Sequence, residues 1–246
     1  KCFLFKEKQY KNLNKILINR DGAFGDSVVA LPALSVIRQN FPSARIDLIT
    51  FSDHGITFAD FNLQDGLVDT ILVKNKKDRI KSIKALKQNN YELFIQLPQN
   101  LGLYKSLRNM IIVRVFMNIK SGLGWDYGRI KSFIETQKKY LITPTETIRL
   151  LNNLNDEGLR GKISYPIKSM EPADQAVIDL LKHKIAIFII GGKQKTKKWP
   201  LENWINLANL IGKDYKIIIV GGLSEEKEAA HIQSRTKNSH NLCNKF

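Results

Sequence analysis

Between residues 15 and 27 the chain reads KILINRDGAFGDS, and this stretch decides the class of the fold. Its first half is an apolar run of strand length, and its second half is a glycine-containing turn that leads into a helical pattern over about 26–40. Glycine permits a tight turn and close approach of a ligand to the backbone, and the start of a helix favours an anion. Such a strand, turn and helix predict an α/β fold whose ligands bind at the carboxyl ends of the strands.

The same alternation of short apolar runs and longer helical patterns continues along the chain. We expect further strands over 45–50, 67–73 and 91–97, helices over 78–88, 103–118 and 146–154, and a loop over 122–128. After a stretch with two prolines (165–172), the pattern restarts with strands over 184–190 and 216–220 and helices over 201–211 and 224–235. This order predicts parallel sheets covered by helices on both faces.

The restart predicts two Rossmann-like domains with a cleft between them. We expect the first domain over 1–165, a linker over 166–183 and the second domain over 184–246. A doubly wound domain usually needs about five or six strands, whereas the second part offers only two strand–helix units. We therefore expect the protein to continue beyond Phe246 by roughly 80 to 100 residues.

The composition excludes several classes of protein. Cys2 and Cys243 stand at opposite ends, and the four histidines have no metal-ligand spacing, so we expect no disulfide framework, no metal site and a reducing compartment. No apolar run reaches the length of a membrane-spanning helix, and no signal peptide is recognisable. The net charge of +16 indicates attraction to nucleic acid, an acidic membrane surface or phosphorylated substrates, although a genome bias toward lysine explains it equally well.

Asp26 is the chemically interesting residue of the first motif. It sits where a side chain would point over the carboxyl ends of the strands, at which ligands bind in open α/β sheets. A plain helix N-cap is the alternative, with Ser27 competing for that role. Around it, the candidate anion-binding loop consists of Arg20, Gly22, Ala23 and Gly25.

Two further motifs lie in the second domain. Residues 191–200 read GGKQKTKKWP directly after a strand, and such a basic loop can hold a phosphate, although a solvated charged loop is the alternative. Residues 217–226 read IIIVGGLSEE, in which Glu225 and Glu226 form an acidic first helical turn that the helix dipole stabilises.

Together these motifs resemble those of glycosyltransferase family 9, the ADP-heptose:lipopolysaccharide heptosyltransferases. The string over 20–34, which ends in Leu-Pro-Ala-Leu, resembles the family's N-terminal signature, and Lys-Lys-Trp-Pro over 197–200 resembles its second motif. The resemblance implies a GT-B fold with Asp26 as general base, Arg20 as the basic residue at the strand end, and Lys197 on the donor diphosphate. The other donor-site candidates that it implies are Gly192, Lys195, Thr196, Glu225 and Glu226. In the family an acidic residue at the place of Glu225 or Glu226 accepts hydrogen bonds from the nucleotide ribose.

Two departures from the family pattern bear on the site. The strand over 91–97 ends in Gln96-Leu97-Pro98, whereas the family commonly has an Asp-Leu-Gln-like string. The family's late Asp-Thr-Gly-x-x-His loop does not occur in these 246 residues.

The resemblance implies an inverting, metal-independent transferase without a cofactor, which moves heptose or a related sugar from an ADP-sugar to a phosphorylated lipid A–core acceptor. Such an enzyme is cytoplasmic and meets the inner face of an acidic membrane, and Arg20, Arg108, Arg114 and Arg129 are candidates for the acceptor phosphates. One alternative is a non-catalytic remnant or binding protein of the same fold. The other alternative is a nucleic-acid-binding protein. The positive charge favours it, but the sequence contains no recognisable nucleic-acid-binding motif, so we expect no nucleic-acid partner.

Overall fold

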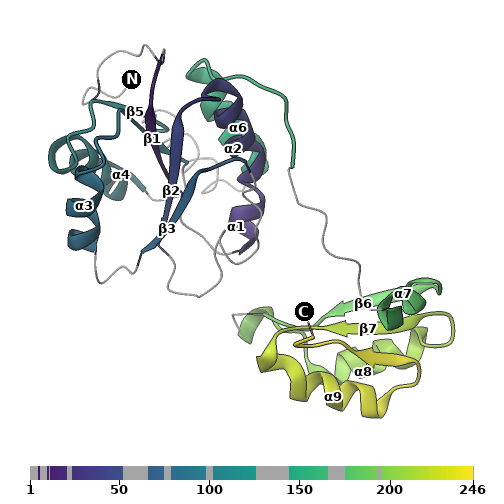
Figure 1. Ribbon diagram of the computed structural model, residues 1–246. Coiled ribbons are helices and arrows are strands. Elements are labelled where there is room, and N and C mark those ends of the chain that lie inside the picture. Colours follow the sequence, from purple (N-terminus) through teal and green to yellow (C-terminus); the bar gives the residue numbers. More distant parts are fainter. Residues whose placement is uncertain are drawn as a thin grey trace. The chain divides into compact units, whose positions relative to one another are not determined.

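The computed structural model describes residues 5, 10, 12–20, 24–51, 66–74, 79–97, 102–125, 144–165, 175–192 and 195–245. The chain forms two compact units, Lys1–Lys168 and Ser169–Phe246, and each is described by itself (Figure 1).

Unit 1 is built on a five-stranded parallel sheet in the order β3-β2-β1-β4-β5. The strands are β1 (Lys15–Asn19), β2 (Arg45–Phe51), β3 (Thr70–Lys74), β4 (Leu93–Gln96) and β5 (Ser121–Leu123). The central strand β1 pairs with β2 on one side and β4 on the other, so that Ile16 is opposite both Ile46 and Leu93. This order agrees with the predicted Rossmann-like topology.

Helices cover both faces of this sheet, as the sequence predicts. They are α1 (Phe24–Val28), α2 (Leu31–Asn40), α3 (Arg79–Lys87), α4 (Gly102–Ile111), the π-helix η3 (Ile112–Phe116) and α6 (Glu146–Asp156). Figure 1 shows α2 and α6 side by side on one face and α3 with α4 on the other. Unit 1 has one apolar core on each face of its sheet, and successive residues of β1 point to opposite faces. Ile16 and Ile18 pack in the core with α2, whereas Leu17 packs with Phe94 and Trp125 in the other core.

Proline divides the helix that the sequence predicts over 26–40. α1 ends at Val28, and α2 begins at Leu31 with Pro32 in its first turn, where the missing N–H costs no hydrogen bond. Pro32 thus lies at the start of a helix and not in the interior of one. The N-cap alternative for Asp26 is wrong, because α1 begins at Phe24 and places Asp26 inside its first turn.

The loop predicted over 122–128 is wrong at its start, because β5 reaches Leu123. The strand is short and contains Gly122, with a second glycine, Gly124, directly after its end, which hides it in a sequence pattern. Both glycines fit tight surroundings: a Cβ on Gly122 would lie 2.8 Å from the Phe5 ring, and one on Gly124 (φ +93°) would lie 1.9 Å from the Gln96 carbonyl oxygen. The helix predicted over 103–118 is also only partly α-helical, since it continues as η3 after Ile111.

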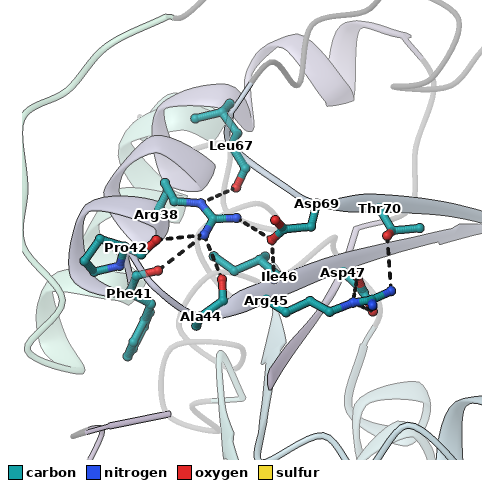
Figure 2. A network of polar contacts seen from close by, with 10 residues as sticks. All are labelled: Arg38, Phe41, Pro42, Ala44, Arg45, Ile46, Asp47, Leu67, Asp69 and Thr70. Carbon is teal, nitrogen blue, oxygen red and sulfur yellow. Dashed lines mark hydrogen bonds and ion pairs between the residues drawn. The ribbon is translucent and has the colours of Figure 1, made fainter. Parts of the chain in front are cut away.

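A polar network ties α2 to the amino ends of β2 and β3 (Figure 2). The guanidinium of Arg38 donates to the main-chain oxygens of Leu67 (3.2 Å) and Ala44 (2.8 Å) and pairs with Asp69 at 2.6 Å. Asp69 also accepts from the Ile46 N–H at 2.7 Å. Ligands of parallel sheets bind at the carboxyl ends, so this network at the opposite end holds the fold together.

Unit 2 carries a three-stranded parallel sheet in the order β6-β7-β8. Its strands are β6 (Ile185–Ile189), β7 (Lys216–Val220) and β8 (Ser239–Asn241). Its helices are α7 (Gln175–Leu181), η4 (Lys195–Lys197), α8 (Leu201–Ile211), η5 (Leu223–Glu225) and α9 (Glu226–Arg235). The core joins Phe188, Ile217 and Ile219 to Ala208 of α8 and Ile232 of α9.

Two expectations for this part of the chain need correction. The linker predicted over 166–183 contains α7, which the two nearby prolines obscured. The strand β8 was not predicted, because its sequence Ser-His-Asn is polar and contains no apolar run. Only its pairing with β7 in the structure identifies it as a strand.

Candidate functional site

Arg20, at the end of β1, is one of the most deeply buried side chains of unit 1, with 1% of its surface exposed. Its Nη1 pairs with Glu146 Oε1 at 3.1 Å, and its Nη2 donates to the main-chain oxygen of Asp26 at 3.1 Å. Burial lowers the pKa of Arg20, although attraction to Glu146 and Asp26 opposes the shift. Arg20 therefore fixes α1 from inside the protein, and little of its surface remains for an acceptor phosphate.

Glu146 and Arg149, which the sequence did not single out, complete this cluster. Arg149 Nη2 lies 2.7 Å from Glu146 Oε1, so the carboxylate bridges two guanidinium groups. Burial opposes ionisation of Glu146, but the hydrogen bond from Arg149 and the two positive charges outweigh it and lower its pKa. From the sequence, a glutamate three residues before an arginine predicts only an ion pair within one helix. The ion pair of Glu146 with Arg20, which is 126 positions away, could be recognised only in the folded structure.

The first turn of α6 also holds the junction between α1 and α2. The hydroxyl of Thr147 donates to the Val29 carbonyl oxygen at 3.1 Å, while Thr145 caps the helix through the Ile148 N–H. The motif helix α1 is therefore clamped at Asp26 by Arg20 and just beyond its end by Thr147.

Asp26 combines a fixed backbone with an accessible side chain. Its side chain keeps 49% of its surface exposed, and Oδ1 lies 4.0 Å from Arg20 Nη2. A carboxylate held in this way can accept a proton from a bound hydroxyl. Gly25 is exposed, and a Cβ at this position would meet no atom within 4 Å, so no contact within the protein requires a glycine here. The approach of a ligand to its backbone stays a prediction. Gly22 and Ala23 lie outside the described residues.

Gln96, the first departure from the family pattern, has a structural role. It is buried at the end of β4, where its Oε1 accepts from Asn19 Nδ2 of the neighbouring strand at 3.1 Å. The Gln96 amide also donates to the Leu97 carbonyl oxygen at 3.4 Å. The carboxyl edge of the sheet therefore has a neutral amide pair at this point.

In unit 2, the basic loop between β6 and α8 presents Thr196 and Lys197 to solvent, both within η4. Gly192 is half-buried, and the side chain of Lys195 lies outside the described residues. Lys198 is different, because its ammonium pairs with Glu225 at 2.9 Å and Glu228 at 3.6 Å. The hydrogen bond with Glu225 raises the pKa of Lys198.

The structure separates the two glutamates that the sequence left as alternatives. Glu225 is buried, with 6% exposed, and its carboxylate accepts from Lys198, from the Gly222 N–H (3.1 Å) and from Ser224 (2.8 Å). The Lys198 hydrogen bond is the largest cause that lowers the pKa of Glu225. A Cβ on Gly191 would lie 3.3 Å from the same carboxylate. Glu225 thus joins the basic loop to the β7–α9 turn, whereas Glu226 is exposed at the start of α9.

The described parts of the chain contain no group of three His, Cys, Asp or Glu side chains that could hold a metal ion. None of the described helices is long and apolar enough to cross a bilayer. The cleft expected between the two domains stays a prediction, because it concerns both units.

Comparison with known proteins connects these features to one family. The family model described as "Glycosyltransferase family 9 (heptosyltransferase)" matches residues 79–246. The chain is 24% identical over 219 residues to "Lipopolysaccharide heptosyltransferase 1" of Salmonella typhimurium, across 80% of this chain and 65% of that protein. It thus spans just under two thirds of the length of that relative.

Solved structures show the same fold. The family 9 glycosyl transferase from Veillonella parvula covers 98% of this chain and 72% of its own, with a TM-score of 0.60 and 18% identity. The E. coli heptosyltransferase WaaC with ADP covers 93% of this chain and 74% of its own, with a TM-score of 0.53 and 19% identity. These likenesses identify the α/β fold as that of the GT-B heptosyltransferases. Because the family model matches well over half of the chain, the protein belongs to glycosyltransferase family 9.

Proposed function

We propose that this protein transfers heptose, or a related sugar, from an ADP-sugar to a lipopolysaccharide core acceptor, with Asp26 as general base. The observation that carries the proposal is the geometry of Asp26 in a family 9 chain: its main chain is clamped by Arg20, and its carboxylate keeps 49% of its surface exposed. Such a group is oriented by the fold and open to a substrate.

The proposed step is a single displacement. The acceptor hydroxyl gives its proton to the Asp26 carboxylate as its oxygen bonds to the anomeric carbon of the donor. The bond from that carbon to the diphosphate oxygen breaks, and ADP leaves with the bonding electrons. One displacement at the anomeric carbon inverts its configuration.

The leaving diphosphate needs positive charge, which we assign to the basic loop of unit 2. Lys197 and Thr196 are exposed there, and Lys195 and Gly192 belong to the same loop. A lysine can take the place of a metal ion in this role, so the proposal requires no metal and no cofactor. We assign the ribose contact to Glu226, because Glu225 is buried among protein donors. The ADP in the WaaC structure supports an adenine nucleotide as donor.

The acceptor assignment rests on a relative and on the charge of the chain. The name of the Salmonella relative favours a lipopolysaccharide acceptor over nucleic acid, and the net charge of +16 fits an acceptor that is phosphorylated and held in a membrane. We therefore propose a location in the cytoplasm, at the inner face of the membrane.

The first test is sugar transfer by Asp26→Asn. Loss of the base should lower kcat roughly a hundredfold to ten-thousandfold, with the fold preserved in circular dichroism. Asp214→Asn, an exposed aspartate of a turn in unit 2, is the matched control and should transfer normally. Near-normal turnover by Asp26→Asn would end the base assignment.

The second test addresses the donor side by calorimetry with ADP-heptose and with other nucleotide sugars. Lys197→Gln should weaken donor binding about tenfold, whereas Lys213→Gln, an exposed lysine after α8, should leave it unchanged. Tight donor binding by the wild-type protein without any transfer would favour the remnant alternative.

A further inference from the structure

The helix formed by α4 and η3 is apolar on two faces. One face packs into the core of unit 1, where Met110, Val113 and Met117 are buried. Ser106 and Asn109 lie on the same side and are also buried. This face attaches the helix to the sheet, because its side chains share a core with Leu17 of β1 and Phe94 of β4.

A second apolar stripe runs along the opposite side, in solvent. Its residues follow helical spacing and have these exposed fractions: Tyr104 79%, Leu107 44%, Ile111 40%, Val115 61% and Phe116 58%. Phe116 follows Val115 directly in η3 and widens the stripe at this end. We call these five residues the α4 stripe.

One apolar face is enough to pack a surface helix against the core. A second continuous apolar face in solvent therefore indicates a binding partner outside unit 1. The other exposed apolar residues of the described chain form smaller groups, such as Ile187 and Ile189 on one face of β6, or stand singly. Leu210 and Leu223, for example, stand singly on separate elements of unit 2. Single exposed residues of that kind are ordinary in a monomer.

The charges around the α4 stripe identify the kind of partner. Residues 102–125 contain Lys105, Arg108, Arg114 and Lys120 and no aspartate or glutamate. Arg108 and Lys120 are exposed. An apolar stripe flanked only by cations is the pattern of a helix that lies in the headgroup region of an anionic membrane.

We propose that the α4 stripe docks this protein on an anionic lipid bilayer, with the apolar side chains in the interface and Arg108 on the lipid headgroups. The inference rests on the proposed function, since a lipid-held acceptor is what would require the enzyme at a membrane. The position in the fold agrees with it. α4 follows the carboxyl end of β4, the edge of the sheet at which Arg20 and Asp26 lie, so its first turn is near the expected acceptor side.

The test is sedimentation with vesicles of phosphatidylcholine alone or mixed with phosphatidylglycerol, in the absence of donor and acceptor. The wild-type protein should bind the mixed vesicles, and Leu107→Gln/Ile111→Gln should bind at least about tenfold more weakly. Arg108→Gln should weaken binding about fivefold at low salt. Leu210→Gln/Leu223→Gln removes two exposed leucines elsewhere and should bind like the wild type.

Three outcomes would overturn the proposal. They are absence of wild-type binding to the mixed vesicles, equal binding by the stripe variant and the wild type, and wild-type self-association that the stripe variant alone abolishes, which would make a second copy the occupant. Circular dichroism of each variant verifies that the fold is kept. Because no sugar transfer is measured, vesicle binding can fail while the transferase proposal stands, and the reverse also holds.

Discussion

The two units hold their motif loops with buried charges of opposite sign. Unit 1 buries a cation, Arg20, against Glu146 and the main chain of Asp26. Unit 2 buries an anion, Glu225, against Lys198 and the Gly222 N–H. Each buried group therefore has partners from the loop or helix that it holds in place.

This difference decides which charge each unit leaves for a ligand. With its cation inside, unit 1 presents the carboxylate of Asp26 to solvent, while unit 2 has its anion inside and presents the ammonium of Lys197. A base and an anion-binding group are what sugar transfer from a nucleotide donor needs. The buried charged group, Arg20 or Glu225, therefore decides the chemistry of each loop as much as the exposed group does.

The largest expected effect comes from Arg20→Met. Removing the buried guanidinium leaves the Asp26 carbonyl without this donor, so unit 1 should lose about 3 kcal/mol of unfolding free energy. Urea titrations that follow the indole N–H signals of Trp125 (unit 1) and Trp204 (unit 2) by NMR measure each unit separately. Unit 2 should be unaffected.

Arg160→Met provides the control for that experiment. Arg160 is an exposed arginine of unit 1, so its loss should change stability by less than about 0.5 kcal/mol. If both variants had the same small effect, Arg20 would not be the clamp of α1.

A smaller effect is expected from Glu225→Gln in unit 2. The amide can still accept hydrogen bonds but loses the charge opposite Lys198, so the cost should be about 1–2 kcal/mol, read from the Trp204 signal. Glu226→Gln, its exposed neighbour, should leave stability unchanged and raise the KM for the donor instead. A large loss of stability in Glu226→Gln would reverse the roles given to the two glutamates.

The pH dependence of stability sharpens the second prediction. The folded pKa of Glu225 is below the ordinary value of 4.5, so its stabilising contribution is complete above that value and is lost as the pH falls through the folded pKa. Glu146 in unit 1 has the same sign. Urea midpoints between about pH 6 and pH 3 should fall for both units in the wild type. In Glu225→Gln, the fall for unit 2 should be shallower, while unit 1 keeps its full slope.

The smallest effect is expected at the start of a helix. Thr145 caps α6 by accepting from the Ile148 N–H, whereas Pro200 precedes α8 without a side-chain cap. Thr145→Ala should cost unit 1 about 0.5–1 kcal/mol, and Thr145→Ser should restore most of it because the hydroxyl remains. Equal stability of the alanine and serine variants would show that the cap contributes nothing.

Much of the fold could be predicted because apolar runs and helical periodicity are local signals. β1, β7 and α8 lie where their apolar patterns place them, and the starting role of Pro32 follows from its missing N–H. The short strands β5 and β8 escaped prediction, because glycine or polar residues leave no such pattern and only pairing with a neighbour defines them. The interruption of a long helix by the π turn of η3 likewise has no local signature.

For the site, the amino-acid sequence alone determined the chemical types: a carboxylate after β1, a basic loop after β6 and two glutamates after β7. Only the tertiary structure decided their roles. It turned Arg20 inward onto Glu146, and it buried Glu225 while leaving Glu226 in solvent. The physical reason is that burial and ion pairing depend on residues far apart in the chain. Local patterns specify which groups are present, and the packing of sheets and helices selects which of them water and a substrate can reach.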